Sequence, residues 1–212
     1  MYQVYAFSTP NSVKVPITLE ELGLQYELHA VNVRNGEQKR PDFVALNANA
    51  KVPVLHDSER SFTLSESAAI LVYLAERHGA LLAQEPITRA RTFEQLFVHA
   101  SGLSPAFGQA GYFLRSAPAG SSEHALGRFA QEARRQLGLL DAVLAARTFV
   151  AGDDFSIADI AHFGWIWRRT FPGMTLDDLP NVQRWYDAVS NRPAVGRAIA
   201  RIESLAEDRQ AA

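Results

Sequence analysis

The pattern of apolar and polar positions divides the chain into two parts that meet near residue 88. In the first part, short runs rich in aromatic and β-branched residues predict strands. These runs are Tyr2–Phe7, Tyr26–Val33, a short run after Pro53, and Phe62–Leu64. A strand, a helix and a strand at the start predict a parallel pair. The last two strands have only polar turn residues between them and predict an antiparallel hairpin.

Helical patterns fill the gaps between these strands. Thr9 and Pro10 are suited to start the first helix as its cap and first residue. Pro16 would remove a helical hydrogen bond unless the helix begins near Ser12, so we expect a late start or a kink. With a helical turn at Pro41–Leu46 and a helix over Ser65–His78, the expected order is β-α-β-α-β-β-α.

Helical periodicity alone continues after a linker at residues 83–88, with an evident loop at Ser116–Ser122. We expect no strand there. The expected helices cover Arg89–Phe113, Glu123–Arg147, Asp154–Thr170, Asn181–Asn191 and Pro193–Leu205. The chain should therefore fold as an α/β domain over residues 1–82 and an all-helical domain over residues 89–212.

Ser156 and Asp159 form the best local signal of the second half. Ser156 is placed as an N-cap, and Asp159 at the third helical position can reach back to the amide of the cap. We interpret Asp159 as a structural carboxylate rather than a catalytic one.

Composition narrows the classes of function. The 212 residues have 47% hydrophobic content, a formal net charge of −2 and no cysteine. No basic field argues for nucleic acid, and the protein has no thiol of its own for catalysis or metal binding. The six histidines are scattered without a metal-binding spacing, so we expect no metal. We see neither a signal peptide nor a membrane span and expect a cytoplasmic protein.

Three stretches carry candidate chemistry, and each also has an ordinary structural interpretation. Lys51, Val52 and Pro53 could present a strand edge to a peptide, or Pro53 could simply start an edge strand. Glu66 and Ser67 open a helix, whose N-terminus accepts a carboxylate well. The ordinary alternative is that Ser65 is a helix cap and Glu66 a first-turn acid.

Thr9 and Asn11, in the third stretch, offer donors that stabilise an anion without becoming nucleophiles, or they serve as turn residues. Gln38 and Lys39 could bind a carboxylate, although a solvated loop explains them better when they are taken alone. Phe107, Tyr112 and Trp165 are core residues by default, and the alternative is that they line an apolar pocket for a second substrate.

Together these stretches resemble the cytosolic glutathione transferases, over the whole chain. The resemblance is carried by Ser8-Thr9-Pro10-Asn11, Lys51-Val52-Pro53-Val54-Leu55, Leu64-Ser65-Glu66-Ser67 and Phe155-Ser156-Ile157-Ala158-Asp159. It implies a thioredoxin-like N-terminal domain plus an all-α C-terminal domain. Thr-Pro-Asn with Gly36-Glu37-Gln38 looks most like the bacterial nu class and its Ure-type relatives, which handle glutathione and its disulfides.

The resemblance also implies roles for the candidate residues. Val52 pairs with the cysteinyl unit of glutathione beside a cis Pro53, and Glu66 and Ser67 hold the γ-glutamyl ammonium and carboxylate. Gln38 holds the glycyl carboxylate, with Lys39 and Lys51 also in the binding region. Thr9 and Asn11 lie near the sulfur. A homodimer is implied as well, in which one of Arg128, Arg134 and Arg135 could serve the partner's site.

Four features depart from the family pattern. Ala50 stands where glycine is common, Ala48 stands where proline is common, and Pro16 interrupts the first helix. The fourth concerns the basic residue that nu-class partners often lend across the dimer, because Glu132 occupies its neighbourhood. The function implied is a glutathione-dependent transferase or disulfide-bond reductase that stabilises the thiolate of glutathione for attack on an electrophile or a disulfide. The alternative is a non-catalytic glutathione-binding regulatory module or a ligand carrier of the same fold.

Overall fold

A computed structural model describes residues 1–118, 120 and 123–207, and its contacts group into two compact units. The first unit contains Met1–Ala80 together with the last helix, and the second contains Leu81–Ser190. No helix among the described residues is long and apolar enough to cross a membrane.

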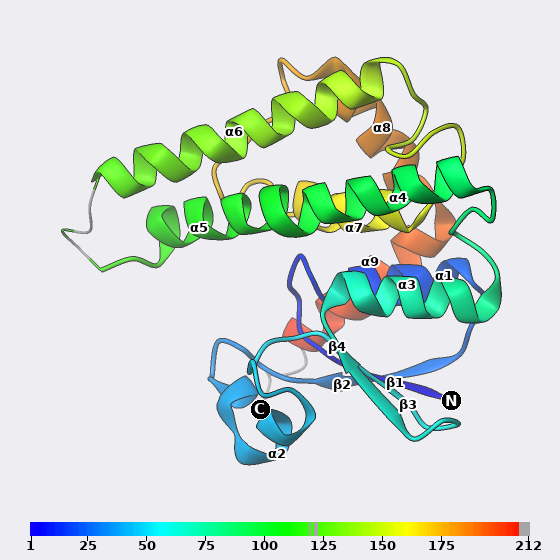
Figure 1. Ribbon diagram of the computed structural model, residues 1–212. Helices are drawn as coiled ribbons and strands as arrows, with labels where there is room; N and C mark the ends of the chain where they lie inside the picture. Colours follow the sequence, from blue (N-terminus) through cyan, green and yellow to red (C-terminus); the bar gives the residue numbers. More distant parts are fainter. Residues whose placement is uncertain (119, 121–122, 208–212) are drawn as a thin grey trace. The chain divides into compact units, whose positions relative to one another are not determined.

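The first unit is built on a four-stranded sheet in the order β2-β1-β3-β4 (Figure 1). The strands are β1 (Tyr2–Ala6), β2 (Tyr26–Ala30), β3 (Val54–Asp57) and β4 (Phe62–Ser65). β1 and β2 run parallel, with Val4 opposite Leu28, and the other neighbours run antiparallel. The predicted parallel pair and the predicted hairpin are both confirmed.

Helices cover both faces of this sheet. α1 (Lys14–Glu21), α3 (Ser67–His78) and α9 (Pro193–Glu207) pack together on one face, with α2 (Pro41–Leu46) and the short η1 (Glu37–Lys39) on the other (Figure 1). β1 alternates accordingly, since Val4 and Ala6 are fully buried and Tyr5 on the opposite face is half-buried. Phe43 of α2 packs with Val31 and Val54 into a small core of its own.

The start of α1 follows from Pro16. The helix begins at Lys14, so Pro16 is its third residue, where a missing N–H breaks no helical hydrogen bond. The late start is therefore confirmed, whereas the expected cap at Thr9 is wrong. Thr9 instead accepts a hydrogen bond from the amide of Ser12 within the turn.

The second unit contains only helices, apart from one isolated β-bridge between Phe149 and Gly152 in its described part. Its helices are α4 (Pro86–Val98), η2 (His99–Leu103), α5 (Ser104–Arg115), α6 (Glu123–Ala145), α7 (Ile157–Trp167) and α8 (Pro180–Ser190). α7 is buried from Ile157 to Ile166 and forms the core of this unit.

Two features of the second unit differ from the sequence expectation. α4 begins at Pro86, inside the expected linker, because Glu85 accepts hydrogen bonds from the amides of Ile87 and Thr88 and proline is favourable at the first helical position. The expected helix over Arg89–Phe113 is interrupted by the π-turn η2. The expected loop at Ser116–Ser122 lies partly outside the described residues.

The last helix, α9, packs on α1 and belongs with the first unit by its contacts, although the sequence suggested the helical domain. Arg192 makes two hydrogen bonds to Glu21, at 2.6 and 2.7 Å, and Arg197 bonds to Glu20 at 2.7 Å. These pairs join the two ends of the first unit, which are separated by more than a hundred residues of sequence.

Candidate functional site

A small cavity of about 50 Å³ in the first unit brings together residues from three separate stretches. Its lining is Asn11, Asn47, Lys51, Val52, Pro53, Glu66 and Ser67. Six of these residues, all except Asn47, are candidates from the sequence whose family roles concern one ligand. Other cavities in the chain are larger, so the chemistry of the lining selects this site, not its volume.

The loop between α2 and β3 forms one wall. The Val52–Pro53 peptide bond is cis, as the resemblance implies. Asn47 organises the loop, because its Nδ2 donates to the carbonyl of Lys51 at 2.7 Å and its Oδ1 accepts from the amide of Asn49 at 3.0 Å. Ala50 adopts a left-handed backbone with φ of 51°, a conformation that glycine adopts at lower cost.

The opposite wall is the start of α3. Ser65 ends β4 and is not the helix cap, which corrects the expectation from sequence. Glu66 takes the cap position with φ of 70° and ψ of 111°, and no side chain in the described part of the chain caps the helix. The first amides of α3 are therefore available to an anion. Such a sparsely populated backbone conformation is typical of residues held for a functional contact.

Asn11 lines the cavity from the turn between β1 and α1, and the side chain of Lys14 contacts it. The Lys14 ammonium donates to Asn11 Oδ1 at 2.7 Å and to Ser67 Oγ at 3.4 Å. Lys14 is 1% exposed, and burial lowers its pKa to about 7 although the charge of Glu66 acts in the opposite direction. The site thus has a buried cation between its two walls.

Other candidates from the sequence lie outside this cavity lining. The Thr9 hydroxyl donates to Ser12 Oγ at 2.9 Å, so it stabilises the turn that presents Asn11. Gln38 is half-buried in η1, where no donor among the described residues reaches its Oε1, and Lys39 beside it is exposed.

The aromatic candidates occupy the second unit. Phe107 is fully buried and lies edge to face with Trp165 at a ring separation of 5.9 Å. Trp165 also donates its indole N–H to Ser104 at 2.8 Å. Tyr112 differs from them, because 46% of its surface is exposed.

The candidate arginines are partly engaged within the same unit. Arg134 pairs with Asp178, and Arg135 bonds to Glu132 at 2.7 and 2.8 Å. The hydrogen bonds from Arg135 and Gln136 hold the pKa of Glu132 at about 2.

Sequence reasoning missed Lys14 and Asn47. Lys14 is the single charged residue in the otherwise apolar stretch from Val13 to Ile17, which is an unusual placement for lysine. Asn47 and Asn49 carry the short polar side chains that bond locally to backbone amides in turns. These two signals were present in the sequence.

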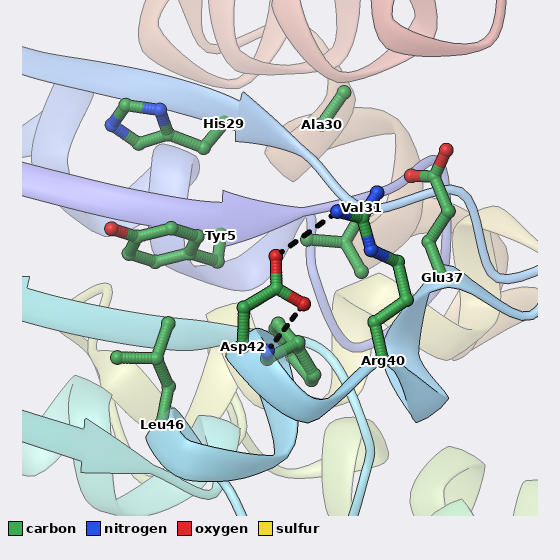
Figure 2. A pocket seen from close by; sticks show the side chains of 9 residues that line it. Tyr5, His29, Ala30, Val31, Glu37, Arg40, Asp42 and Leu46 are labelled. Atoms are coloured by element: carbon green, nitrogen blue, oxygen red, sulfur yellow. Dashed lines mark hydrogen bonds and ion pairs between the residues drawn. The ribbon is translucent and has the colours of Figure 1, made fainter.

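A larger cavity of about 380 Å³ opens on the α2 face of the sheet (Figure 2). Tyr5 and His29 stack there at a ring separation of 4.8 Å. Its charged groups already have partners within the protein, since Asp42 pairs with Arg40 and accepts from the amide of Phe43. Glu37 accepts from the amide of Asn32. Arg40, Asp42 and Glu37 therefore each have a partner within the protein.

Comparison with known families gives two matches that fit the fold. A model of the glutathione S-transferase N-terminal domain matches residues 9–77, and one of the glutathione S-transferase C-terminal domain matches residues 103–193.

Individual relatives agree with these matches. The chain is 35% identical to the disulfide-bond oxidoreductase YfcG of Escherichia coli, over 96% of each chain. It is 37% identical to YghU, a disulfide-bond oxidoreductase of the same organism, over 92% of this chain and 73% of YghU. A glutathione transferase family member from Pseudomonas fluorescens, solved with two glutathione molecules bound, is 38% identical with a TM-score of 0.86, covering 93% of this chain and 92% of that one.

Proposed function

The chain belongs to the glutathione S-transferase family, and from this premise we propose that it binds glutathione in its first unit and uses the thiolate to reduce small disulfides. A transferase reaction with a small electrophile is the second activity open to the same thiolate. The observation that carries the proposal is the meeting of Asn11, the cis Val52–Pro53 bond, Glu66 and Ser67 in one cavity.

Each part of glutathione has a matching group in the proposal. The backbone of Val52 pairs with the cysteinyl unit. Glu66 pairs with the γ-glutamyl ammonium, while Ser67 and the free backbone amides at the start of α3 bind the γ-glutamyl carboxylate. Asn11 donates to the sulfur, and Thr9 contributes by holding the turn that carries Asn11.

The remaining contacts rest on the resemblance. Gln38 takes the glycyl carboxylate, with Lys39 and Lys51 contributing positive charge. Of the aromatic candidates for the second substrate, Tyr112 has the exposed surface needed to meet it. We propose a cytoplasmic homodimer, with Arg128 as a candidate for contact across the dimer because Arg134 and Arg135 are engaged by carboxylates.

The chemistry follows from the sulfur of the ligand. A cysteine thiol has an ordinary pKa near 8.5, and lowering it by about two units requires about 2.7 kcal/mol of preferential thiolate stabilisation. The thiolate attacks one sulfur of a disulfide, releasing the other as a thiol and leaving a mixed disulfide with glutathione. A second glutathione displaces the second thiol and leaves glutathione disulfide. The chain has no cysteine, so every sulfur comes from the ligands.

Disulfide reduction is favoured over transfer for two reasons. YfcG and YghU are both named disulfide-bond oxidoreductases. A relative from Pseudomonas putida, 38% identical with a TM-score of 0.85, over 93% of this chain and 90% of that one, was solved with one glutathione disulfide per subunit.

The proposal is tested by steady-state kinetics with glutathione and hydroxyethyl disulfide, and in parallel with a chloronitrobenzene. Asn11→Ala should lower kcat/KM for the disulfide about 10- to 100-fold, because a hydrogen bond to a charged group contributes about 1.5–3 kcal/mol. Asn35→Ala removes an exposed asparagine outside the cavity and should leave the rate unchanged. Tight glutathione binding without turnover of either substrate would favour the regulatory module or carrier, and no glutathione binding would refute the proposal.

A further inference from the structure

Lys14 is a buried charged group that the proposed chemistry does not yet use. It is the first residue of α1 and one of only three lysines in the chain. Lysine is almost never fully buried unless its charge is compensated, and this one is 1% exposed.

The contacts of Lys14 join the two walls of the site. Its Nζ donates to Asn11 Oδ1 at 2.7 Å and to Ser67 Oγ at 3.4 Å, across 53 positions of sequence. Asn11 belongs to the wall assigned to the sulfur, and Ser67 to the wall assigned to the γ-glutamyl carboxylate. Lys14 therefore contacts both Asn11, which is expected at the sulfur, and Ser67, which is expected at the γ-glutamyl carboxylate.

The same contact fixes the orientation of the Asn11 amide. An ammonium is only a donor, so the atom of Asn11 that it meets must be the carbonyl oxygen. With the oxygen held, the NH2 group is what Asn11 offers to the cavity that it lines. An amide NH2 donates to a sulfur anion, whereas a carbonyl oxygen would repel it.

Burial disfavours the charged form of Lys14 in the ligand-free protein. Burial lowers its pKa to about 7 and outweighs the attraction of Glu66 at the start of α3. Glu20 and Glu21 lie six and seven residues further along α1, about 9–10 Å away, and the arginines of the α9 region engage both. An anion in the cavity would offset the cost of burying the ammonium.

We propose that Lys14 is the positioning residue for the reactive sulfur of glutathione: it orients the Asn11 amide toward the sulfur, and its charge favours the thiolate over the thiol. This inference rests on the proposed function, because it takes glutathione as the ligand and Asn11 as its sulfur contact. The inference adds Lys14 to the site as a residue that orients Asn11 and whose own positive charge stabilises the thiolate.

Two variants separate the parts of this role. Lys14→Met removes both the hydrogen bond and the charge, whereas Lys14→Gln keeps a donor for Asn11 and removes only the charge. Arg60→Met removes an exposed cation from the turn between β3 and β4 and serves as the control. Thermal unfolding checks that each variant is folded, and calorimetry gives its glutathione affinity.

The decisive readout is the ultraviolet absorbance of the bound thiolate as a function of pH. S-methylglutathione, which has no ionisable thiol, supplies the baseline. An opposite charge within about 4–6 Å lowers a pKa by about 1–3 units, so the bound thiol pKa should rise by at least about one unit in Lys14→Met. It should rise less in Lys14→Gln and stay unchanged in Arg60→Met.

The outcomes distinguish this inference from its premise. If the unmodified protein binds glutathione with a lowered thiol pKa and both Lys14 variants keep that pKa, the inference is overturned and the proposed function stands. If the unmodified protein does not bind glutathione, both fail together. Should Lys14→Met not fold, the result with Lys14→Gln decides.

Discussion

At the scale of single residues, Lys14 shows the cost of burying a charged group in the folded unit. Its ammonium is desolvated by burial, and only part of that cost is offset by its hydrogen bonds and by Glu66. The cost depends on pH, because it exists only while the group is protonated.

This dependence gives a prediction for the ligand-free protein. The folded-state pKa of Lys14 is about 7 and the unfolded value is 10.5, so the unfolded chain binds more protons between those values. Stability contributed by Lys14 therefore rises with pH across that window, while below pH 7 the full cost is present. The free energy of unfolding of the unmodified protein should rise relative to Lys14→Met by about 2 kcal/mol between pH 7 and pH 9.

Urea denaturation of both proteins at several pH values measures this difference. Contributions from other groups that titrate alike in the two proteins cancel when their free energies of unfolding are subtracted. Saturating glutathione should shrink the pH dependence, because a bound anion keeps Lys14 protonated. Parallel stability curves for the two ligand-free proteins would show that the buried lysine keeps an ordinary pKa.

At the scale of elements, the start of α7 shows a helix fixed by one buried carboxylate. Asp159 accepts hydrogen bonds from the amide and hydroxyl of Ser156 and from the amide of Val150, at 2.8–3.0 Å. Trp185 of α8 adds its indole N–H at 2.9 Å. Burial raises the pKa of Asp159 while these donors act against that shift. The capping box is confirmed, and the same carboxylate also ties α8 to α7.

Asp159→Asn is the matching test. The new NH2 group would face a donor on whichever side it is placed, leaving at least one buried donor without an acceptor. We expect a loss of about 2–3 kcal/mol in the free energy of unfolding, against about 1 kcal/mol for the control Ser156→Ala, which removes only the cap hydroxyl. Chemical denaturation measures both. Equal stability of Asp159→Asn and the unmodified protein would mean that the carboxylate is not structurally required.

Sequence patterns predicted the helices and strands whose bounds depend on neighbouring residues. They failed for features that depend on residues distant in sequence. The strands, the late α1 and the Ser156–Asp159 box follow from spacing and from Pro16. The π-turn η2 was missed because it depends on the approach of α6. A Cβ on Gly102 would lie 2.8 Å from Gln136, and Pro105 lacks the N–H of a regular helix. Lys14 carries a sequence signal as a lysine beside apolar residues, but its contacts with Asn11 and Ser67 depend on the folded unit.

At the scale of the whole molecule, the chain order and the compact units do not coincide. α9 comes after all the helices of the second unit but packs on α1, where Val195, Ala198 and Ile202 are fully buried. α1 also carries Lys14 at its first position. The C-terminal helix therefore supports the unit that holds the proposed glutathione site.

Ile202→Ala should destabilise the first unit rather than the second. Removing a fully buried isoleucine side chain costs about 2–5 kcal/mol, and the cavity would lie against α1. Arg197→Ala is the control from the same helix, because its pair with Glu20 is partly exposed and such pairs contribute about 0–1 kcal/mol. Hydrogen exchange followed by mass spectrometry should show faster exchange in α1 and β1 of Ile202→Ala, with α6 and α7 unchanged. Faster exchange confined to α4–α8 would show instead that α9 is coupled to the helical unit, as the order of the sequence had suggested.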